Sequence, residues 1–429
     1  MTNPFASLGL SRALVRAASD RGYAEPTAIQ AAAIPAALAR RDVLASAQTG
    51  SGKTAAFALP ILQQLEGIRR EAPRRTHALV LVPTRELAAQ VGESMRDLAQ
   101  HLAAPVKVAI VFGGVSINPQ MMKLRGGAEV VIATPGRLLD LIDHNALGLS
   151  GVAVLVLDEA DRLLDAGFAD ELARVLALLP RRRQNLLFSA TLPPAVQALA
   201  QGMLSDPIHI DTPPRRVRFS APLADPTTQP TVTQHAIEVD APRRTPLLRH
   251  MLLQAGWTRV LVFVATRYAS ERVAGKLRQA GIAAAAFHGD ASQGARTKVL
   301  ADFKAGRLQV LVATDVAARG IDIAQLPVVV NYDLPRSPVD HVHRIGRTGR
   351  AGESGVAVSF ISAESEAHFR LIEKRQGQRV VLERIAGFEP VESVAPAAAV
   401  GGVKGKRKSK KDKLREAGAR HDQSGSDST

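Results

Sequence analysis

The strongest structural signal in this chain of 429 residues is the segment Val43-Leu44-Ala45-Ser46-Ala47-Gln48-Thr49-Gly50-Ser51-Gly52-Lys53-Thr54. Its first three residues predict a short buried strand, and a helix-forming apolar stretch runs from Thr54 to Leu65. In the turn between them, glycines let backbone N–H groups face a phosphate, and the helix start adds positive potential. The segment therefore predicts a phosphate-binding P-loop, although Ala47 stands where the general pattern has glycine.

This loop predicts a site for nucleotide phosphates and a metal ion. Lys53 is placed to reach the β- and γ-phosphates, and the Thr54 hydroxyl to bind Mg²⁺. The loop residues expected to hold the phosphates are Gln48, Thr49, Gly50, Ser51, Gly52 and Lys53. An ordinary Gly/Ser turn is the alternative, and the strand–loop–helix setting makes it a minor one.

A second apolar run ends in acidic residues. Val154-Leu155-Val156-Leu157 leads into Asp158-Glu159-Ala160-Asp161. Open parallel sheets bind ligands at the carboxyl ends of their strands, where these carboxylates would lie. In P-loop enzymes an aspartate at this place holds Mg²⁺, and a neighbouring glutamate can polarise the attacking water. A solvated acidic loop is the alternative, and the P-loop upstream makes it the less favoured reading.

Short apolar runs alternate with amphipathic stretches in two parts of the chain, which is typical of parallel strands covered by helices. These runs occupy 43–45, 78–82, 108–112, 130–133, 152–157 and 186–188, then 260–264, 283–287, 310–313, 328–330 and 356–361. Residues 213–230 between them hold five prolines and no long apolar run, as in a semi-extended linker. We therefore expect an α/β protein with domains over 1–212 and 231–390, and a disordered basic tail over 391–429.

The charge balance raises the odds of a polyanionic partner. Lys and Arg number 55 against 40 Asp and Glu, which gives a net charge of +15. Such a surplus points most often to nucleic acid, although basic charge can also serve solubility alone. Residues 404–415 contain eight basic residues and one acidic residue, so the tail could grip nucleic acid or only keep the chain in solution.

Composition excludes several classes of site and protein. The chain has no cysteine, which excludes disulfides and thiolate metal sites. It has no run of 18 apolar residues, and the stretch from Met1 to Phe5 lacks the pattern of a secretory signal. We expect an intracellular, cytoplasmic protein that does not enter a membrane.

A third candidate element is the loop His343-Arg344-Ile345-Gly346-Arg347-Thr348-Gly349-Arg350. Three arginines so close together are costly to bury and unusual in a connection between elements. If the loop faces the P-loop, Arg347 and Arg350 could neutralise the charge of a γ-phosphate during its transfer. An exposed basic loop that binds only RNA phosphates fits the spacing equally well.

Taken together, these motifs resemble the DEAD-box RNA helicases of superfamily 2, from residue 5 to about residue 390. The acidic motif 158–161 reads D-E-A-D, and residues 22–30, with Phe5 upstream, resemble the family's Q motif. Other family motifs follow in order at 83–87, 113–114, 134–137, 189–191, 262–266, 293–296 and 313–322. Residues 377–390 and the basic tail are similar to the bacterial RhlE-type group. The resemblance implies two tandem RecA-like parallel-sheet domains.

The resemblance also implies roles at an ATP site. Gln30 would read the adenine edge, Tyr23 would stack on its ring, and Phe5 would belong to the same pocket. Lys53, Thr54 and Asp158 would hold the phosphates and Mg²⁺, while Glu159 would orient the water. From the second domain, Arg347 and Arg350 would act as arginine fingers, and Gly320 and Asp322 would touch the nucleotide. The residues expected to couple hydrolysis to the RNA state are Ser189, Thr191, Asp161 and His343.

The implied partner is RNA, gripped with little sequence preference because the contacts go to phosphate and sugar. The implied RNA-binding residues are Arg85, Gly114, Thr134 and Arg137 in the first domain and Thr266, Arg296 and Thr314 in the second.

Two functions stay open: an RNA-dependent ATPase that separates short duplexes locally, or a nucleotide-gated RNA clamp or annealing chaperone. Ribosome-assembly or RNA-decay proteins are possible partners. Two features depart from the family's pattern, namely a long linker over 213–230 and Ala265 in place of a polar residue.

Overall fold

The computed structural model describes residues 3–47, 50–68, 71–165, 167–211, 232–318, 326–349 and 354–391. The chain divides into one unit from Met1 to Pro390 and another from Val391 to Thr429. Two of the expected segments lie outside the described residues, namely the linker 213–230 and the tail after Val391. So do five expected site residues: Gln48, Thr49, Gly320, Asp322 and Arg350.

The first sheet has seven strands in the order β3-β4-β2-β5-β6-β1-β7. Every neighbouring pair is parallel. The strands are β1 (Val43–Ser46), β2 (Ala78–Leu81), β3 (Val108–Val111), β4 (Val130–Ala133), β5 (Val154–Leu157), β6 (Gln184–Ser189) and β7 (Ile208–Asp211). Because all seven run the same way, the loops that follow them lie at one edge of the sheet.

The second sheet repeats this arrangement in the order β10-β11-β9-β12-β13-β8-β14, again entirely parallel. Its strands are β8 (Val232–Glu238), β9 (Val260–Val264), β10 (Ala284–Phe287), β11 (Val310–Thr314), β12 (Val328–Asn331), β13 (Gly355–Ile361) and β14 (Leu382–Glu383). Adding seven to each strand number of the first sheet gives the order of the second. The two sheets therefore share one topology.

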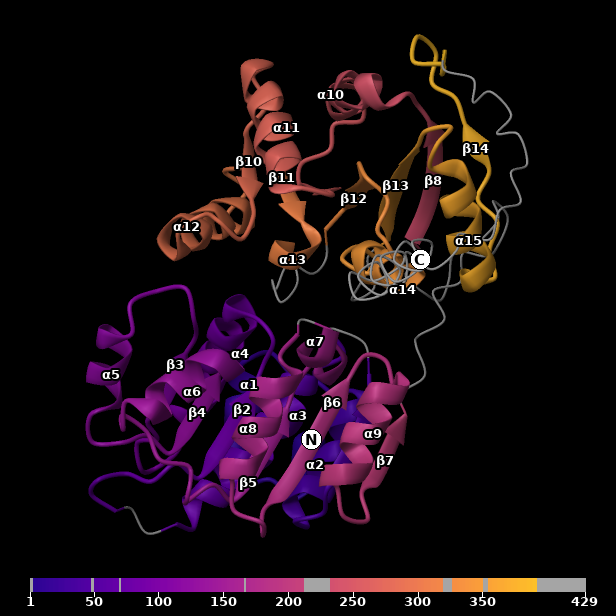
Figure 1. The fold of residues 1–429 in the computed structure, drawn as a ribbon. Helices are drawn as coiled ribbons and strands as arrows, with labels where there is room; N and C mark the ends of the chain where they lie inside the picture. Colours follow the sequence, from indigo (N-terminus) through magenta and orange to yellow (C-terminus); the bar gives the residue numbers. More distant parts are fainter. Residues whose placement is uncertain are drawn as a thin grey trace, which may run out of the picture. The chain divides into compact units, whose positions relative to one another are not determined.

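Helices connect the strands and cover both faces of each sheet (Figure 1). In the first half they are η1 (Pro4–Leu8), α1 (Arg12–Asp20), α2 (Ala28–Leu38), α3 (Lys53–Glu66), α4 (Arg85–Ala99), α5 (Asn118–Leu124), α6 (Pro135–Asp143), α7 (Ala160–Asp165), α8 (Ala169–Leu178) and α9 (Pro194–Met203). In the second half they are η2 (Ala241–Arg243), α10 (Arg244–Gln254), α11 (Arg267–Gln279), α12 (Gln293–Lys304), α13 (Asp315–Ala318), α14 (Pro338–Ile345) and α15 (Glu366–Gln376).

Alternation of side chains along each strand divides the core of the first sheet into two layers. On one face, Val156 of β5 packs in the cluster that contains Phe57 of α3. On the other face, Leu157 packs in the cluster that contains Leu138 of α6. Strands buried on both faces need an apolar residue at every position, which explains the unbroken Val- and Leu-rich runs in the sequence.

The expected fold class, two tandem RecA-like parallel-sheet domains, is confirmed. Each predicted apolar run is a strand, and the predicted helices from Thr54 and Arg85 are α3 and α4. Strands β7, β8 and β14 were not predicted. Strand β7 holds the last place of the first sheet, and β8 and β14 hold the last two places of the second. Many of their residues are only partly buried, so polar side chains interrupt the apolar pattern. The exact domain boundaries stay predictions.

No helix within the described ranges combines the length and the apolar character that crossing a membrane requires.

Paired glycines before β4 give a test of the first sheet's packing. Gly126 and Gly127 have φ angles of +74° and +76°. A Cβ added at Gly127 would lie 1.8 Å from the carbonyl oxygen of Arg74, whereas one at Gly126 meets nothing within 4 Å. Gly126→Ala should lower the free energy of unfolding by about 1–2 kcal/mol through backbone strain alone. Gly127→Ala should lower it by about 1–3 kcal/mol more through overpacking.

The measurement is chemical unfolding followed by circular dichroism, with Gly126→Ala as the matched control. Equal midpoints for the two variants would contradict the close approach of Arg74.

Candidate nucleotide and nucleic-acid site

The carboxyl ends of three neighbouring strands gather the expected nucleotide residues. Strands β5, β6 and β1 stand next to one another in the first sheet. The P-loop follows β1, the acidic motif follows β5, and Ser189 ends β6 directly opposite Ser46. The Ala47 amide extends this pairing by donating to the Ser189 carbonyl at 2.9 Å. Residues more than a hundred positions apart therefore share one site.

The P-loop turns into α3 through glycines in left-handed conformations. Gly50 and Gly52 have φ angles of +78° and +94°, a region that side chains disfavour. Lys53, the first residue of α3, is only 6% exposed, and its Nζ donates to the Ala47 carbonyl at 2.9 Å. The ammonium group is thereby held over its own loop, beside the start of a 14-residue helix. Cation, helix start and turn together make an anion site.

Gln30 ties the Q motif to this loop. Its Nε2 donates to the Gly52 carbonyl at 3.2 Å, and its Oε1 accepts from the Thr27 amide at 3.0 Å. A Cβ added at Gly52 would lie 2.4 Å from that Nε2, so the contact requires glycine. An amide has two donor hydrogens and two acceptor lone pairs, which leaves one of each for a ligand. Gln30 is therefore oriented by the P-loop and still able to pair with a base edge.

Phe5 and Tyr23 are held together but are not equally accessible. Phe5 is fully buried in the core, whereas Tyr23 is half-buried and packs against the same cluster. Their ring centroids lie 6.3 Å apart. Phe5 was expected among the nucleotide-binding residues, and that role stays a prediction. Its ring is buried beside Tyr23, so it is placed to hold Tyr23 in position.

Asp158 and Glu159 are buried carboxylates in a strained turn. They are 3% and 4% exposed, and Glu159 has a φ angle of +54°. The Glu159 amide donates to Asp158 Oδ1 at 2.9 Å. Burial raises the pKa of Asp158 to about 6, while Lys53 opposes that shift. A bound cation would favour the ionised form further, so the environment suits a positively charged ligand.

Asp161 joins the acidic motif to the loop after β6. Its backbone amide donates to Ser189 Oγ at 3.2 Å. Its Oδ2 accepts from the Thr191 amide at 3.0 Å and from Thr191 Oγ1 at 2.7 Å. The structure therefore brings together three of the four residues expected to couple hydrolysis to RNA, and their coupling role stays a prediction.

His343, the fourth of these residues, contacts the motif through Arg162. Arg162 Nη2 lies 2.7 Å from His343 Nδ1, and Arg162 Nη1 pairs with Glu159 at 3.1 Å. Burial and the neighbouring Arg162 lower the pKa of His343 to about 4, so the ring is neutral at pH 7 and accepts this bond. The printed sequence offered one signal for Arg162, its position three residues after Glu159 on a helix. The sequence reasoning missed it.

Arg344 near the end of α14 and Arg347 in the loop that follows have different surroundings. Arg344 is 2% exposed, forms two bonds of 2.6 Å to Asp315, and stacks over Phe263. It also donates to the Asp333 carbonyl at 2.6 Å. These contacts occupy Arg344 in holding the loop to β11 and β12. Arg347, 8% exposed, follows one turn later, where its carbonyl accepts from Leu326.

The residues of the first sheet expected to bind RNA follow three other neighbouring strands, β3, β4 and β2. Arg85 packs against Gly114, where an added Cβ would lie 2.5 Å from its guanidinium. Thr134 Oγ1 accepts from the Gly113 amide at 3.4 Å. Arg137 donates to the Val115 carbonyl at 2.7 Å, and its buried Nη1 has no hydrogen-bond partner within the described ranges. An unpaired buried donor is suited to an added acceptor such as a phosphate oxygen.

The second sheet places its expected RNA residues in the same way, after β9, β10 and β11. Thr266 is the exposed N-cap of α11, and Thr314 ends β11. Arg296 is 4% exposed, stacks over Phe287, and pairs with Glu86 at 2.9 Å. Its Nε has no hydrogen-bond partner among the described residues.

Family models match both halves of the chain. The DEAD/DEAH box helicase family matches residues 27–199, and the helicase conserved C-terminal domain matches residues 244–352. These ranges contain the first and second sheets for the most part, together with the motifs described above.

Curated relatives and a solved structure agree with these matches. The chain is 42% identical to the ATP-dependent RNA helicase DeaD of Mycobacterium tuberculosis over 389 residues, which cover 91% of the chain and 66% of the relative. It is 38% identical to the DEAD-box ATP-dependent RNA helicase CshA of Bacillus cereus, covering 86% and 67%. S. cerevisiae Dbp5 bound to RNA and ADP BeF3 superposes with a TM-score of 0.74 at 30% identity, covering 90% and 96%. The RhlE-type subgroup stays a prediction.

The chain thus spans about two thirds of the length of these curated relatives, with the helicase motifs in the shared part. On the family models, the identity and the shared architecture, it belongs to the DEAD-box helicase family.

Proposed function

We propose that the protein is an RNA-dependent ATPase that separates short RNA duplexes locally and remodels RNA or RNA–protein complexes. The observation that carries the proposal is the division of the first sheet's carboxyl edge. In the first sheet, nucleotide-type residues follow β5, β6 and β1, and RNA-type residues follow β3, β4 and β2. A nucleotide and an RNA strand would thus bind side by side on one rigid edge.

ATP is the proposed nucleotide. The free donor and acceptor of Gln30 match the edge of adenine, and a base that leaves the buried amide unpaired would be rejected. Tyr23, backed by Phe5, would cover the ring. The P-loop and Lys53 would hold the phosphates, and Gly320 and Asp322 are proposed to touch the nucleotide from the second half.

Mg²⁺ is the proposed metal, and the donor set fits it. Thr54 and Asp158 supply the two hard oxygen ligands, and no larger His/Asp/Glu cluster able to hold a metal occurs in the described part of the chain. Mg²⁺ commonly takes one or two protein ligands and completes its shell with water and phosphate. When bound, it would neutralise charge on the phosphates.

ATP hydrolysis requires a residue that orients the attacking water and residues that neutralise the charge on the transferred phosphate. Glu159, held by Arg162, would orient the attacking water. Arg347 and Arg350 would stabilise the charge that develops on the transferred phosphate. Asp161, Ser189, Thr191 and His343 would link this step to the RNA-bound state.

RNA is the proposed polymer, contacted through phosphate and sugar and therefore with little sequence preference. The unpaired donors of Arg137 and Arg296 support an acceptor-rich ligand at this edge. Local, non-processive opening of an RNA duplex fits a clamp formed by two domains.

We further propose domains over 1–212 and 231–390, a connecting linker over 213–230, a basic tail that anchors RNA, and a cytoplasmic location. Ribosome-assembly or RNA-decay proteins are proposed as partners.

A nucleotide-gated RNA clamp or annealing chaperone is the second candidate. The basic segment 404–415 favours it, because a basic arm can bring strands together without hydrolysis. The buried acidic motif favours the enzyme, since an annealer has no need of a positioned Glu159.

The first test is steady-state ATP hydrolysis with and without single-stranded RNA, with DNA of the same sequence as the control. We expect strong stimulation by RNA and little by DNA, because 2′-hydroxyl contacts tell the two apart. An ATP hydrolysis rate that does not change when RNA is added would overturn the proposal of an RNA-dependent ATPase and favour the clamp.

Glu159→Gln separates the two candidate functions. The variant should bind ATP and RNA but turn over ATP at least about a hundredfold more slowly, because the water is no longer oriented by a carboxylate. Duplex separation with repeated release should fall with it, whereas annealing should continue. Full unwinding by the variant, measured with a labelled duplex, would remove Glu159 from the mechanism.

Lys53→Ala and Arg347→Ala should each slow ATP turnover by about a hundredfold or more, since positioning and charge neutralisation dominate phosphoryl transfer. Lys374→Ala on α15 is the control, because Lys374 is an exposed cation with no hydrogen bond or ion pair within the described residues. Near-normal turnover in either test variant would exclude that residue.

A further inference from the structure

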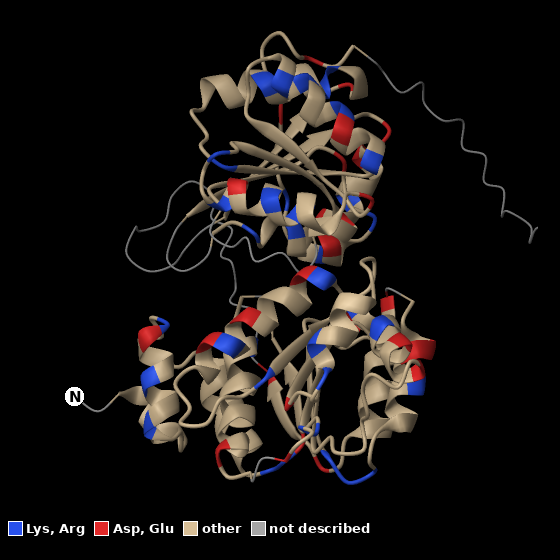
Figure 2. Ribbon diagram, turned by 90° about the vertical axis from the view of Figure 1, so that its left-hand side faces the viewer, with Lys and Arg blue, Asp and Glu red and all other residues tan. Residues whose placement is uncertain are grey.

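The net charge of the second half is concentrated in one segment. Residues 241–281 contain eight Lys and Arg and one acidic residue, a net charge of +7. The other described residues of 232–391 contain twelve basic and twelve acidic residues, a net charge of zero. The excess therefore belongs to α10, α11 and their loops, where Figure 2 colours the basic residues blue.

Helices α10 and α11 cover a single face of the second sheet. Leu248 of α10 and Val273 of α11 pack in the cluster that holds the even-numbered residues of β9, such as Val262. The odd-numbered Phe263 belongs to a different cluster, on the opposite face, with Phe303 of α12. The basic surface thus lies on a different face of the sheet from α12, which carries Arg296.

Three cations on this face have no counter-ion among the described residues. Arg249, Arg272 and Lys276 are exposed, and none has a hydrogen bond or ion pair within the described ranges. The one acidic residue of the segment, Glu271, is paired with His288 at 2.9 Å. Three neighbouring cations without a counter-ion make a surface that attracts anions.

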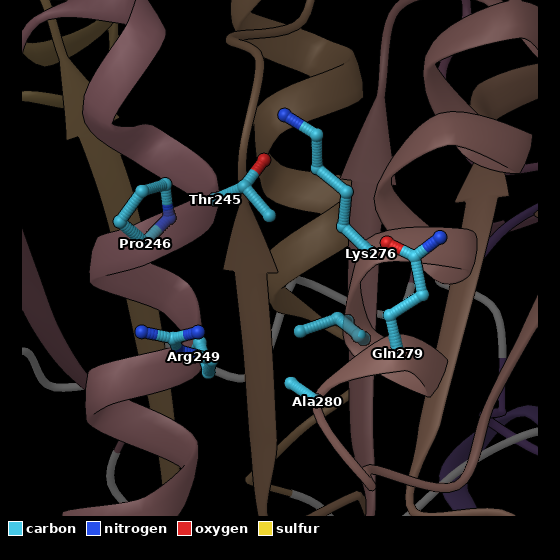
Figure 3. A pocket seen from close by; sticks show the side chains of 7 residues that line it. Thr245, Pro246, Arg249, Lys276, Gln279 and Ala280 are labelled. Atoms are coloured by element: carbon cyan, nitrogen blue, oxygen red, sulfur yellow. The ribbon is translucent and has the colours of Figure 1, made fainter.

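Two of these cations, Arg249 and Lys276, border a hollow between the two helices (Figure 3). Its volume is about 260 Å³. Arg249 lines it from α10, and Lys276 and Gln279 line it from α11. The floor is Leu277, which belongs to the core.

The surface also connects to the expected RNA residues. Tyr268, Arg272 and Lys276 follow at intervals of four, so they form one stripe of about 12 Å along α11. Tyr268 is 72% exposed and stands two residues after Thr266, the N-cap of the helix. An exposed ring can stack on a base, and the cations beyond it can follow the backbone.

We propose that the α10–α11 face, defined as Arg249, Tyr268, Arg272 and Lys276, is an additional binding surface for RNA that extends beyond the main site. The proposal rests on the proposed RNA-dependent function. RNA is favoured over an acidic protein segment because the stripe begins beside Thr266 and includes an exposed ring. The surface would lengthen the bound RNA without taking part in ATP turnover.

The test compares two triple substitutions, each of which removes three positive charges from the intact chain. The test variant is Arg249→Gln/Arg272→Gln/Lys276→Gln, and the control is Lys374→Gln/Arg375→Gln/Arg379→Gln, three exposed cations on or just after α15. Binding to single-stranded RNAs of increasing length is measured over a range of salt concentrations. The test variant should lose affinity only for the longer RNAs, and its slope of log K against log [salt] should flatten by about two, whereas the control should not change.

Tyr268→Ala supplies a second readout. It should weaken binding of longer RNA by about fivefold or more without changing the salt slope, because stacking is not ionic. Equal slopes for the parent and the triple variant, or equal losses in the control, would overturn the proposal. If instead the parent's ATP hydrolysis does not respond to the shortest RNA, the proposed function fails, which is a separate result.

Discussion

Parallel pairing of the strands is the constraint from which the rest of the structure follows. It places every loop after a strand at the same edge, so short polar segments far apart in the chain become neighbours. The amide of Ala47 and the carbonyl of Ser189, 142 positions apart, meet there at 2.9 Å. Because the strands are covered on both faces, this edge is also where polar side chains can reach a ligand without being buried in the core. The second sheet repeats the same solution.

The polar groups at this edge support one another. Asp161 is buried, and an unpaired buried carboxylate would cost several kcal/mol. Its Oδ2 accepts two bonds from Thr191, and its amide donates to Ser189. Glu159 is likewise paired with Arg162. Replacing one of these partners would leave a buried carboxylate without a hydrogen bond or ion pair. The acidic motif is therefore energetically coupled to the residues around it.

The two surfaces of the second half differ in how they use cations. Arg344 and Arg296 are buried, stacked on phenylalanines and paired with carboxylates, so their geometry is rigid. The cations of the α10–α11 face are exposed and have no protein partner in the described part of the chain. Rigid arginines suit a defined phosphate position, whereas exposed ones suit a strand that varies in sequence and length.

Most strands of both sheets and the main motifs of the candidate site could be predicted from the sequence. Apolar runs covered on both faces leave an unmistakable pattern, and the P-loop and acidic motif carry their chemistry in consecutive residues. Strands β7, β8 and β14 could not be predicted, since their polar residues are tolerated only because of their places in the sheets. Nor could the sequence distinguish Arg344 from Arg347, because both belong to one basic motif. Asp315 and Phe263, which contact Arg344, come from distant elements. The sequence determines motifs whose residues are consecutive in the chain. Only the tertiary structure decides which residues from distant elements pair with one another.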